Sequence, residues 1–258
     1  MKKQGSDCMI SIKSKHEIEL MKEAGMMVSK THKYLQKYIK PGITTKDLDE
    51  LAEEYIRSMG GIPTCKGYEG FPATLCTSIN DEVVHGIPSN RKLKNGDIIT
   101  IDMVIGYKGY QGDAAWTYAV GSISDEKKYL MEHTEKALYE GIKQVKPGAH
   151  IGDISNAIEI YATKHKLGVV KELVGHGIGT EMHEDPDVPN YGKPGHGPRL
   201  KEGMVICIEP MLNLGTADIE MLDDNWTIVT RDEKPSAHYE HTVLITKDGY
   251  EILTPRLD

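Results

Sequence analysis

The chain has 258 residues, of which 39% are hydrophobic and 27% charged, and it carries a net charge of −8. No apolar run approaches the roughly 18 residues that a membrane-spanning helix needs, so we expect no contact with a membrane. The acidic balance and a mean hydropathy of −0.43 indicate an ordinary globular protein and argue against a specific nucleic-acid-binding surface.

Two helices are predicted in the first half of the chain. Residues 1–13 lack periodicity and are interpreted as a short, loose lead-in. Ser14–Glu17 has the S-x-x-E form of a capping box, and apolar side chains then recur at helical spacing over 18–39 until a Pro-Gly pair ends the pattern. Thr44 can cap a second helix, whose apolar stripe runs over 48–59. A helix pair of this kind usually covers one face of a sheet.

The next stretch predicts a loop region and a β-hairpin. Residues 62–90 are rich in Gly, Pro and Tyr, a composition typical of loops that build sites. The β-branched run over 97–105 is typical of a strand buried on both faces. Gly106–Gly112 contains three glycines and indicates a turn, so that Asp113 begins the return strand. Asp102 and Asp113 are therefore expected side by side across the hairpin.

The second half predicts the same series of elements again. Apolar spacing indicates one helix over 124–146 and another from 151 to a closing Gly168. A His-containing loop, VGHGIGTEMHEDP, and a strand that ends at Glu209 follow. Residues 187–199 are rich in Pro and Gly and are interpreted as an insertion, after which short strands continue to the C-terminus.

Two pairs of segments repeat along the chain. LKNGDIITID, which ends at Asp102, aligns with LKEGMVICIE, which ends at Glu209, at an offset of 107 residues. KPGITTKDL aligns with KPGAHIGDI at an offset of 106 residues. We infer one body made of two duplicated halves, about 14–121 and 122–258. Each copy of the longer repeat is predicted to be a short buried strand that ends in a carboxylate.

These carboxylates and one histidine form a candidate metal site. Asp102, Asp113, Glu209 and Glu240 cannot gather at neutral pH without protons or cations to offset their repulsion. His176 lies between two glycines, which allow close backbone approach and leave its ring uncovered. Such an oxygen-rich set with one imidazole suits Mn, Fe, Co or Zn. Two such ions can activate a water molecule and polarise a carbonyl group, which is metal-assisted hydrolysis.

Each of these residues also has an ordinary structural interpretation. A single acid at a strand end is more often a turn former or a surface charge than a ligand. Asp102 and Glu209 occupy the same position in the two copies of the repeat, and this match favours the metal-ligand interpretation for both. His196 has the same Gly-His-Gly setting as His176 but is interpreted as a solvated loop residue, which shows that the tripeptide alone is a weak signal.

Several motifs together resemble those of the type I methionine aminopeptidases: CTSINDEVVHGIP, IDMVIGYKGYQGD, GHGIGTEMHEDP, the IEP at 208–210 and the YEHT at 239–242. The likeness extends from about Ile10 to the C-terminus. It implies the pseudo-symmetric pita-bread α/β (α+β) fold, with a curved antiparallel sheet covered by two helix pairs. We expect one catalytic domain over 14–258, behind the lead-in 1–13.

The resemblance also implies roles for individual residues. Dinuclear metal ligands fall on Asp102, Asp113, His176, Glu209 and Glu240. Of these, Glu209 is also the expected proton shuttle. His85 and His183 match the histidines that contact the substrate. The methionine pocket maps to Cys65, Tyr68, Phe71, Cys76 and Trp226, and their ordinary interpretation is core packing. Met182, which stands where many relatives carry an aromatic residue, departs from the family and is expected to alter the pocket floor.

The activity implied is removal of the initiator methionine from nascent polypeptides with a small second residue. Two divalent ions, Co, Mn, Fe, Zn or Ni, are expected as cofactors, and the substrates suggest action close to the ribosome surface. An X-Pro aminopeptidase is the first alternative, although such enzymes generally carry a large extra N-terminal domain. A non-catalytic pita-bread binding protein is the second, although such relatives typically lose ligands that are all present here.

Cell compartment and assembly are also expectations. The N-terminus lacks the continuous apolar stretch of a secretory signal. Four scattered cysteines without a C-x-x-C pair argue against a disulfide framework and against structural zinc. We therefore expect a cytoplasmic protein. The sequence contains no clear oligomerisation motif, so a monomer is the default.

Overall fold

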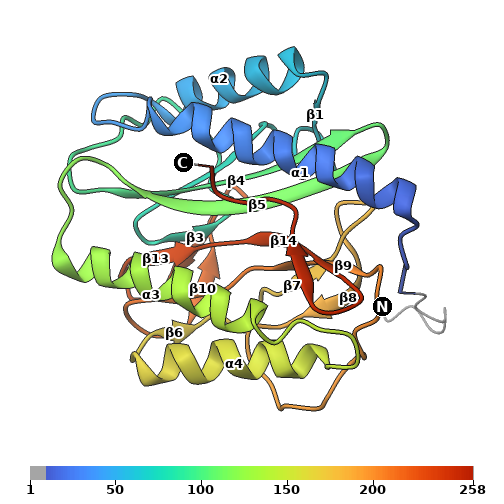
Figure 1. Ribbon diagram of the computed structural model, residues 1–258. Helices are drawn as coiled ribbons and strands as arrows, with labels where there is room; N and C mark the ends of the chain where they lie inside the picture. The colour runs from blue at the N-terminus through green and yellow to red at the C-terminus, as the bar shows by residue number, and fades with distance from the viewer. Residues whose placement is uncertain (1–9, 258) are drawn as a thin grey trace.

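The computed structural model describes residues 10–257 and has helices on both sides of a layer of strands (Figure 1). One helix pair, α1 (Lys15–Gln36) and α2 (Thr45–Ser58), lies on one side. The other pair, α3 (Asp125–Ile142) and α4 (Ile151–Lys164), lies on the opposite side. The predicted α/β class with two covering helix pairs is confirmed.

The predicted helix starts are confirmed by their caps. Ser14 Oγ accepts from Glu17 N at 3.4 Å, and Glu17 Oε2 accepts from Ser14 N at 2.6 Å. Thr44 and Asp47 form the same reciprocal pair before α2. The first helix ends at Gln36, earlier than the apolar pattern to residue 39 predicts. Pro41 restricts the residue before it, which favours this earlier end.

The strands form four antiparallel sheets. The first contains β1 (Ile62–Pro63), β2 (Cys76–Ile79), β4 (Ile98–Tyr107) and β5 (Tyr110–Ala119). The second contains β6 (Gly168–Val169), β10 (Met211–Asn213) and β13 (Ser236–His238). The third contains β3 (Glu82–Val84), β11 (Ile219–Met221) and β12 (Ile228–Thr230). The fourth contains β7 (Gly175–Gly177), β8 (Glu184–Val188), β9 (Val205–Ile208), β14 (His241–Ile245) and β15 (Tyr250–Ile252). A 3-10 turn at Tyr68–Gly70 precedes β2.

The predicted turn of the β4–β5 hairpin is too long. Tyr107 pairs with Tyr110, so the loop consists of Lys108 and Gly109, with φ values of 48° and 86°. Two successive positive φ values are the signature of the tight turns that match the twist of a hairpin. The strands therefore continue through most of the segment that was predicted to be a turn.

This longer hairpin changes the placement of the two aspartates. Asp102 lies within β4 and not at its end, so the predicted strand-end position is wrong for this copy of the repeat. Asp102 pairs with Ala115, whereas Asp113 pairs with Val104. The aspartates are thus diagonal neighbours on one face of the hairpin, within reach of a shared ligand.

The second copy of the repeat pairs differently. β9 pairs with β14, which is joined to it by a long connection and not by a hairpin turn. Ile208 lies opposite His241, so extending this register by one residue places Glu209 opposite Glu240. Glu240 itself lies between β13 and β14 and not within a strand. Its backbone N–H donates to Ala115 O at 2.7 Å, which joins the two halves at the site.

Matching contacts support the duplication. An isolated bridge joins Thr44 to Lys92 in the first half, and another joins His150 to Arg199 in the second. Thr44 and His150 are separated by the offset of the shorter repeat, and Lys92 and Arg199 by that of the longer repeat. The principal hydrophobic core also takes side chains from both halves, from Val28 to Ile245.

The described part of the predicted lead-in is not loose. Lys13 N donates to Gly203 O at 2.8 Å, and the residue is only 6% exposed. Residues 10–13 are therefore fastened to the second half, while 1–9 lie outside the described residues. None of the helices between residues 10 and 257 is both long and apolar enough to cross a membrane.

Candidate metal centre

All thirteen side chains predicted for the site line one cavity of about 340 Å³. They come from both halves of the chain, so the fold brings together residues that lie far apart in sequence. Seven further residues complete the lining, and most of them are apolar. The thirteen are Cys65, Tyr68, Phe71, Cys76, His85, Asp102, Asp113, His176, Met182, His183, Glu209, Trp226 and Glu240.

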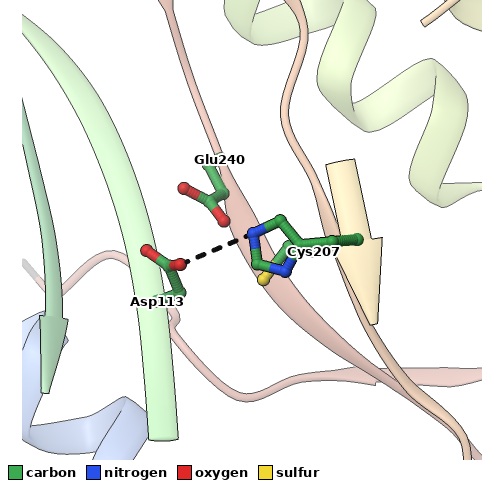
Figure 2. Close-up of side chains that lie close together, drawn as sticks. Asp113, Cys207 and Glu240 are labelled. Atoms are coloured by element: carbon green, nitrogen blue, oxygen red, sulfur yellow. Dashed lines mark ion pairs between the residues drawn. The ribbon is translucent and has the colours of Figure 1, made fainter. Parts of the chain in front are cut away.

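Carboxylates and one imidazole meet in this cavity. His176 Nε2 lies 3.4 Å from Glu209 Oε1 and 3.8 Å from Asp113 Oδ2. Asp113 is 4% exposed and Glu240 2% exposed, yet Asp113 Oδ1 and Glu240 Oε1 have no hydrogen-bond partner. Figure 2 shows the two carboxylates turned towards a shared space. Buried oxygens without partners are costly, and a cation would satisfy them.

The protonation of these acids is strongly perturbed. Burial raises the pKa of Asp102 to about 7. Burial, followed by the neighbouring carboxylates, raises the pKa values of Asp113, Glu209 and Glu240 well above their usual range. Both causes disfavour the charged form unless a positive charge lies among the oxygens. A site of this kind therefore holds protons when empty of cations and exchanges them for metal.

His176 is arranged as a neutral ligand. Its Nδ1 lies 2.9 Å from Gly177 O, so Nδ1–H donates there and the lone pair of Nε2 faces the carboxylates. Burial lowers the pKa of His176 to about 4, which keeps the ring neutral at physiological pH. The flanking glycines allow the predicted close approach of the backbone: a Cβ at Gly175 would lie 2.3 Å from Cys207 O, and one at Gly177 would lie 2.2 Å from Asp185 O. The ring itself is not uncovered as predicted, because His176 is only 8% exposed. The donor set fits a divalent transition metal.

Stability of the metal-free protein should fall between about pH 6.5 and pH 8. The unfolded carboxylates are fully ionised in this window, whereas the folded chain still binds protons at acids whose pKa values are raised, Asp102 among them at about 7. Folding therefore takes up protons, and stability is lost as pH rises through the folded pKa values, by about 1.4 kcal/mol per pH unit for each retained proton. Thermal unfolding after chelation measures this change. Saturating Mn²⁺ should raise the melting temperature and remove the decline, and a metal-free protein that gains stability with pH would contradict this electrostatic account.

Two further histidines stand at the cavity wall. His85 has a φ of 60°, a conformation that non-glycine residues seldom adopt and that often marks a functional site. Its ring packs edge-on to Trp226, with 6.3 Å between the centroids. His183 is exposed on its outer side, and its Nδ1 lies 2.9 Å from the hydroxyl of Tyr68. Partial burial of each ring lowers its pKa, in His85 to about 4.

An apolar pocket adjoins the carboxylates. Cys65, Phe71, Cys76 and Met182 are each at most 7% exposed and belong to one cluster. Tyr68 and Trp226 pack against this cluster, and the Phe71 and Trp226 rings meet edge-on at 5.1 Å. All six residues line the cavity, so the predicted grouping is present. Exposed His196 does not line it, in agreement with its interpretation as a loop residue.

Sequence reasoning missed His238 and Cys207, which adjoin the predicted ligands. His238 is 1% exposed, neither ring nitrogen has a hydrogen-bond partner, and Nε2 lies 3.7 Å from Glu209 Oε2. Cys207 is fully buried and lies beside Asp113, His176 and Glu240. Each precedes a predicted ligand by two residues, His238 before Glu240 and Cys207 before Glu209. Side chains two residues apart on an extended chain point to the same face, so this spacing could have indicated both residues.

A cavity that gathers acids and a neutral imidazole beside an apolar pocket defines a metal-dependent hydrolase. Residues 19–247 match metallopeptidase family M24. Methionine aminopeptidase 1 of Bacillus subtilis (strain 168) is 53% identical over 246 residues, which cover 95% of this chain and 99% of that protein. The chain belongs to family M24 and, within it, to the type I methionine aminopeptidases. It is thus a metallo-aminopeptidase that binds divalent metal.

Solved structures agree with this placement. The crystal structure of methionine aminopeptidase from Rickettsia prowazekii has a TM-score of 0.95 at 43% identity and covers 96% of this chain and 100% of that one. Prolidase from Pyrococcus furiosus has a TM-score of 0.76 at 23% identity and covers 96% of this chain but 66% of its own, a likeness of fold alone. The predicted pita-bread fold is confirmed, and the X-Pro alternative is not favoured.

Proposed function

We propose that this chain removes the initiator methionine from new polypeptides with a small second residue, using two divalent ions. The proposed ligands are Asp102, Asp113, His176, Glu209 and Glu240. The observation that supports this assignment best is a neutral imidazole that lies 3.4 Å and 3.8 Å from two carboxylates. Beside it are buried carboxylate oxygens, Asp113 Oδ1 and Glu240 Oε1, that have no hydrogen-bond partner. When bound, the ions would activate a water molecule and polarise the scissile carbonyl.

Glu209 is the proposed proton carrier. Its pKa lies well above the usual range because of burial and the neighbouring acids, so it can hold a proton near neutral pH. A general acid–base group works best when its pKa lies near the working pH. Glu209 would take a proton from the attacking water and deliver it to the leaving amine of the second residue.

His183 and His85 are proposed to contact the substrate. If Tyr68 donates its hydroxyl proton to His183 Nδ1, at 2.9 Å, the neutral ring carries its own proton on Nε2. That N–H can then donate to the carbonyl oxygen as negative charge develops there. His85, held against Trp226, would contact the substrate near the scissile bond from the other wall.

The apolar pocket is the proposed seat of the methionine side chain. Its sulfur and aromatic groups suit a thioether, since such contacts stabilise by roughly 0.3–1.5 kcal/mol each. Met182 closes part of the pocket with its own flexible side chain, 6% exposed. Crowding between the pocket and the carboxylates would restrict the second residue to a small one.

Trp226→Ala should raise KM for methionyl peptides about tenfold with little change in kcat, because the pocket loses apolar contact that is present in both ground and transition states. Steady-state kinetics on a Met-Ala peptide measure this effect. Leu222→Ala, an exposed site in the same connection, is the matched control and should leave KM unchanged. An unaltered KM in Trp226→Ala would remove the methionine pocket from this position.

The function is tested with metal-free protein refilled with Mn²⁺, Co²⁺ or Fe²⁺ and three peptides. Met-Ala-Ser should release methionine, whereas Met-Lys-Ser and Ala-Pro-Ala should remain intact. Cleavage of Ala-Pro-Ala alone would establish the X-Pro activity instead. Absence of turnover with every metal would refute both enzymatic proposals.

The remaining expectations are part of the same proposal. One catalytic domain over 14–258 is supported by the shared core and by the backbone bond from Glu240 to Ala115. A monomer is proposed because one chain supplies every side chain assigned to the site. Action on nascent chains places the enzyme in the cytoplasm near the ribosome surface.

A further inference from the structure

The cysteine at position 207 lies among residues assigned as metal ligands. One candidate donor atom from each of Asp113, His176, Cys207 and Glu240 lies within 4.8 Å of the other three, and all four residues are buried. Figure 2 shows the Cys207 sulfur beside the space between the two carboxylates. Cys207 does not line the cavity, so its sulfur contacts the cluster from outside the cavity lining.

The local hydrogen bonds leave this sulfur available as a donor. The thiol lies 3.7 Å from Thr242 Oγ1, a weak hydrogen bond, and is also within hydrogen-bonding reach of the Glu240 carboxylate. The Thr242 hydroxyl already donates to Asp113 O at 2.8 Å and accepts from Asp113 N at 3.0 Å. Asp113 Oδ1 and Glu240 Oε1, both unpartnered, face the same space. Among these hard oxygen donors the sulfur is a soft donor, and a soft donor shifts the preference of a site towards thiophilic cations.

We propose that Cys207 acts as a soft ligand at one metal position, so that the centre favours thiophilic ions such as Cd²⁺, Zn²⁺ and Co²⁺ over Mn²⁺. Binding would displace the thiol proton to solvent and form a metal–sulfur bond from the sulfur lone pair, with no change in oxidation state. Ligand atoms of a tetrahedral site lie about 2.0–2.3 Å from the ion. The distances between the four donor atoms must therefore shorten when the ion binds. This inference rests on the metal centre of the proposed function.

The test uses the metal-free full chain and Cd²⁺ followed by ultraviolet absorption. A thiolate-to-cadmium charge-transfer band should appear in the wild type and be absent in Cys207→Ser. Serine keeps a group that can hydrogen-bond Thr242, so a purely structural thiol would leave the affinities unchanged. The affinity for Cd²⁺ relative to Mn²⁺ should fall at least about tenfold in the variant. Cys76→Ser, which alters a buried thiol outside the four-residue cluster, should keep the band.

The outcomes separate the two proposals. Cd²⁺ binding without the band, or a band that persists in Cys207→Ser, would overturn the role of Cys207 and leave the metal centre intact. Failure of the wild type to bind either Cd²⁺ or Mn²⁺ would overturn the metal centre itself.

A different observation concerns the loop between His176 and His183. Lys13 Nζ lies 2.6 Å from Glu184 Oε2, and the two side chains are only 4% and 16% exposed. The other oxygen, Glu184 Oε1, accepts from the backbone N–H of Glu181 at 3.3 Å and from the hydroxyl of Thr180 at 3.5 Å. The carboxylate therefore ties the loop that carries His183 to the segment before α1.

We infer that Lys13 is a positioning residue for His183. Glu184 directly follows His183 and pairs with Gly177, the neighbour of His176. Removing Lys13 leaves a half-buried carboxylate without its counter-ion, which is more disruptive than removing both charges. The loop would shift to hydrate Glu184 and would move His183 away from the substrate carbonyl.

The test is a double-mutant cycle of Lys13→Met and Glu184→Gln. Lys13→Met should lower kcat about tenfold with little change in KM or metal affinity, since a small displacement of a transition-state contact is sufficient. Lys13→Arg should restore much of kcat, and the double variant should be more active than Lys13→Met alone. Unchanged kcat in Lys13→Met, or losses that simply add in the double variant, would overturn the inference. If Lys13→Met fails to fold, the activity of the folded double variant and of Lys13→Arg decides it.

Discussion

Asp113→Asn should abolish metal-dependent release of methionine while the chain stays folded. Asp113 Oδ2 faces His176 and Oδ1 has no partner, so the carboxylate is placed to bind a cation. An amide of the same shape removes the negative charge that would offset a bound cation. Loss of an outer partner of a metal ligand already costs 10–100-fold, so loss of a direct ligand should lower kcat/KM by more than about 100-fold.

The fold should tolerate this change because Asp113 is held through its backbone. Its N–H and C=O both bond Thr242 Oγ1, and neither bond involves the carboxylate. Metal content after dialysis, melting temperature and kcat/KM together measure the outcome. Asp125→Asn, at an exposed carboxylate with 98% of its side chain accessible, is the control. Near wild-type turnover by Asp113→Asn would exclude Asp113 from the site.

Glu209→Gln is expected to lower kcat by about 10²–10⁴-fold, the range typical for loss of a general acid–base group. The glutamine amide keeps the size of the side chain but cannot carry a proton between water and the leaving amine. KM should change far less than kcat, because binding of methionine depends on the separate apolar pocket. Glu209 is also a proposed metal ligand, so its kcat is compared at matched metal occupancy, whereas the loss of Asp113 should first show as lost metal.

The measurement is steady-state turnover at matched metal occupancy. Glu202→Gln, an exposed change on the turn before β9, is the control. The pH profile adds a second readout, since the limb that reflects Glu209 titration should disappear in the variant. A kcat within a few fold of the wild type at full occupancy would assign proton transfer to another group, with His238, whose Nε2 lies 3.7 Å from Glu209 Oε2, as the first candidate.

Local chemistry made several features predictable from the sequence. The capping box at Ser14 and the cap at Thr44 depend on residues close in sequence, and the repeated strands depend on a pattern of ten residues. The ligand candidates were visible because acids at matching ends of apolar repeats are unusual, and because the motifs around His176 and Glu240 resemble one family. Each of these signals comes either from residues close in sequence or from resemblance to the motifs of a known family.

Other features of the fold and the site depend on how the strands pair and pack in the folded chain. The two strands of the hairpin stay paired up to a tight turn at Lys108–Gly109, where both φ values are positive. Asp102 therefore lies in the middle of a strand and not at its predicted end. The approach of Cys207 and His238 to the ligands follows from the pairing of β9 with β14 and the contact of Glu240 with β5, which join residues distant in sequence. The burial of Lys13 against Glu184 likewise has no local signature, since a lysine is buried only where a distant carboxylate comes to meet it.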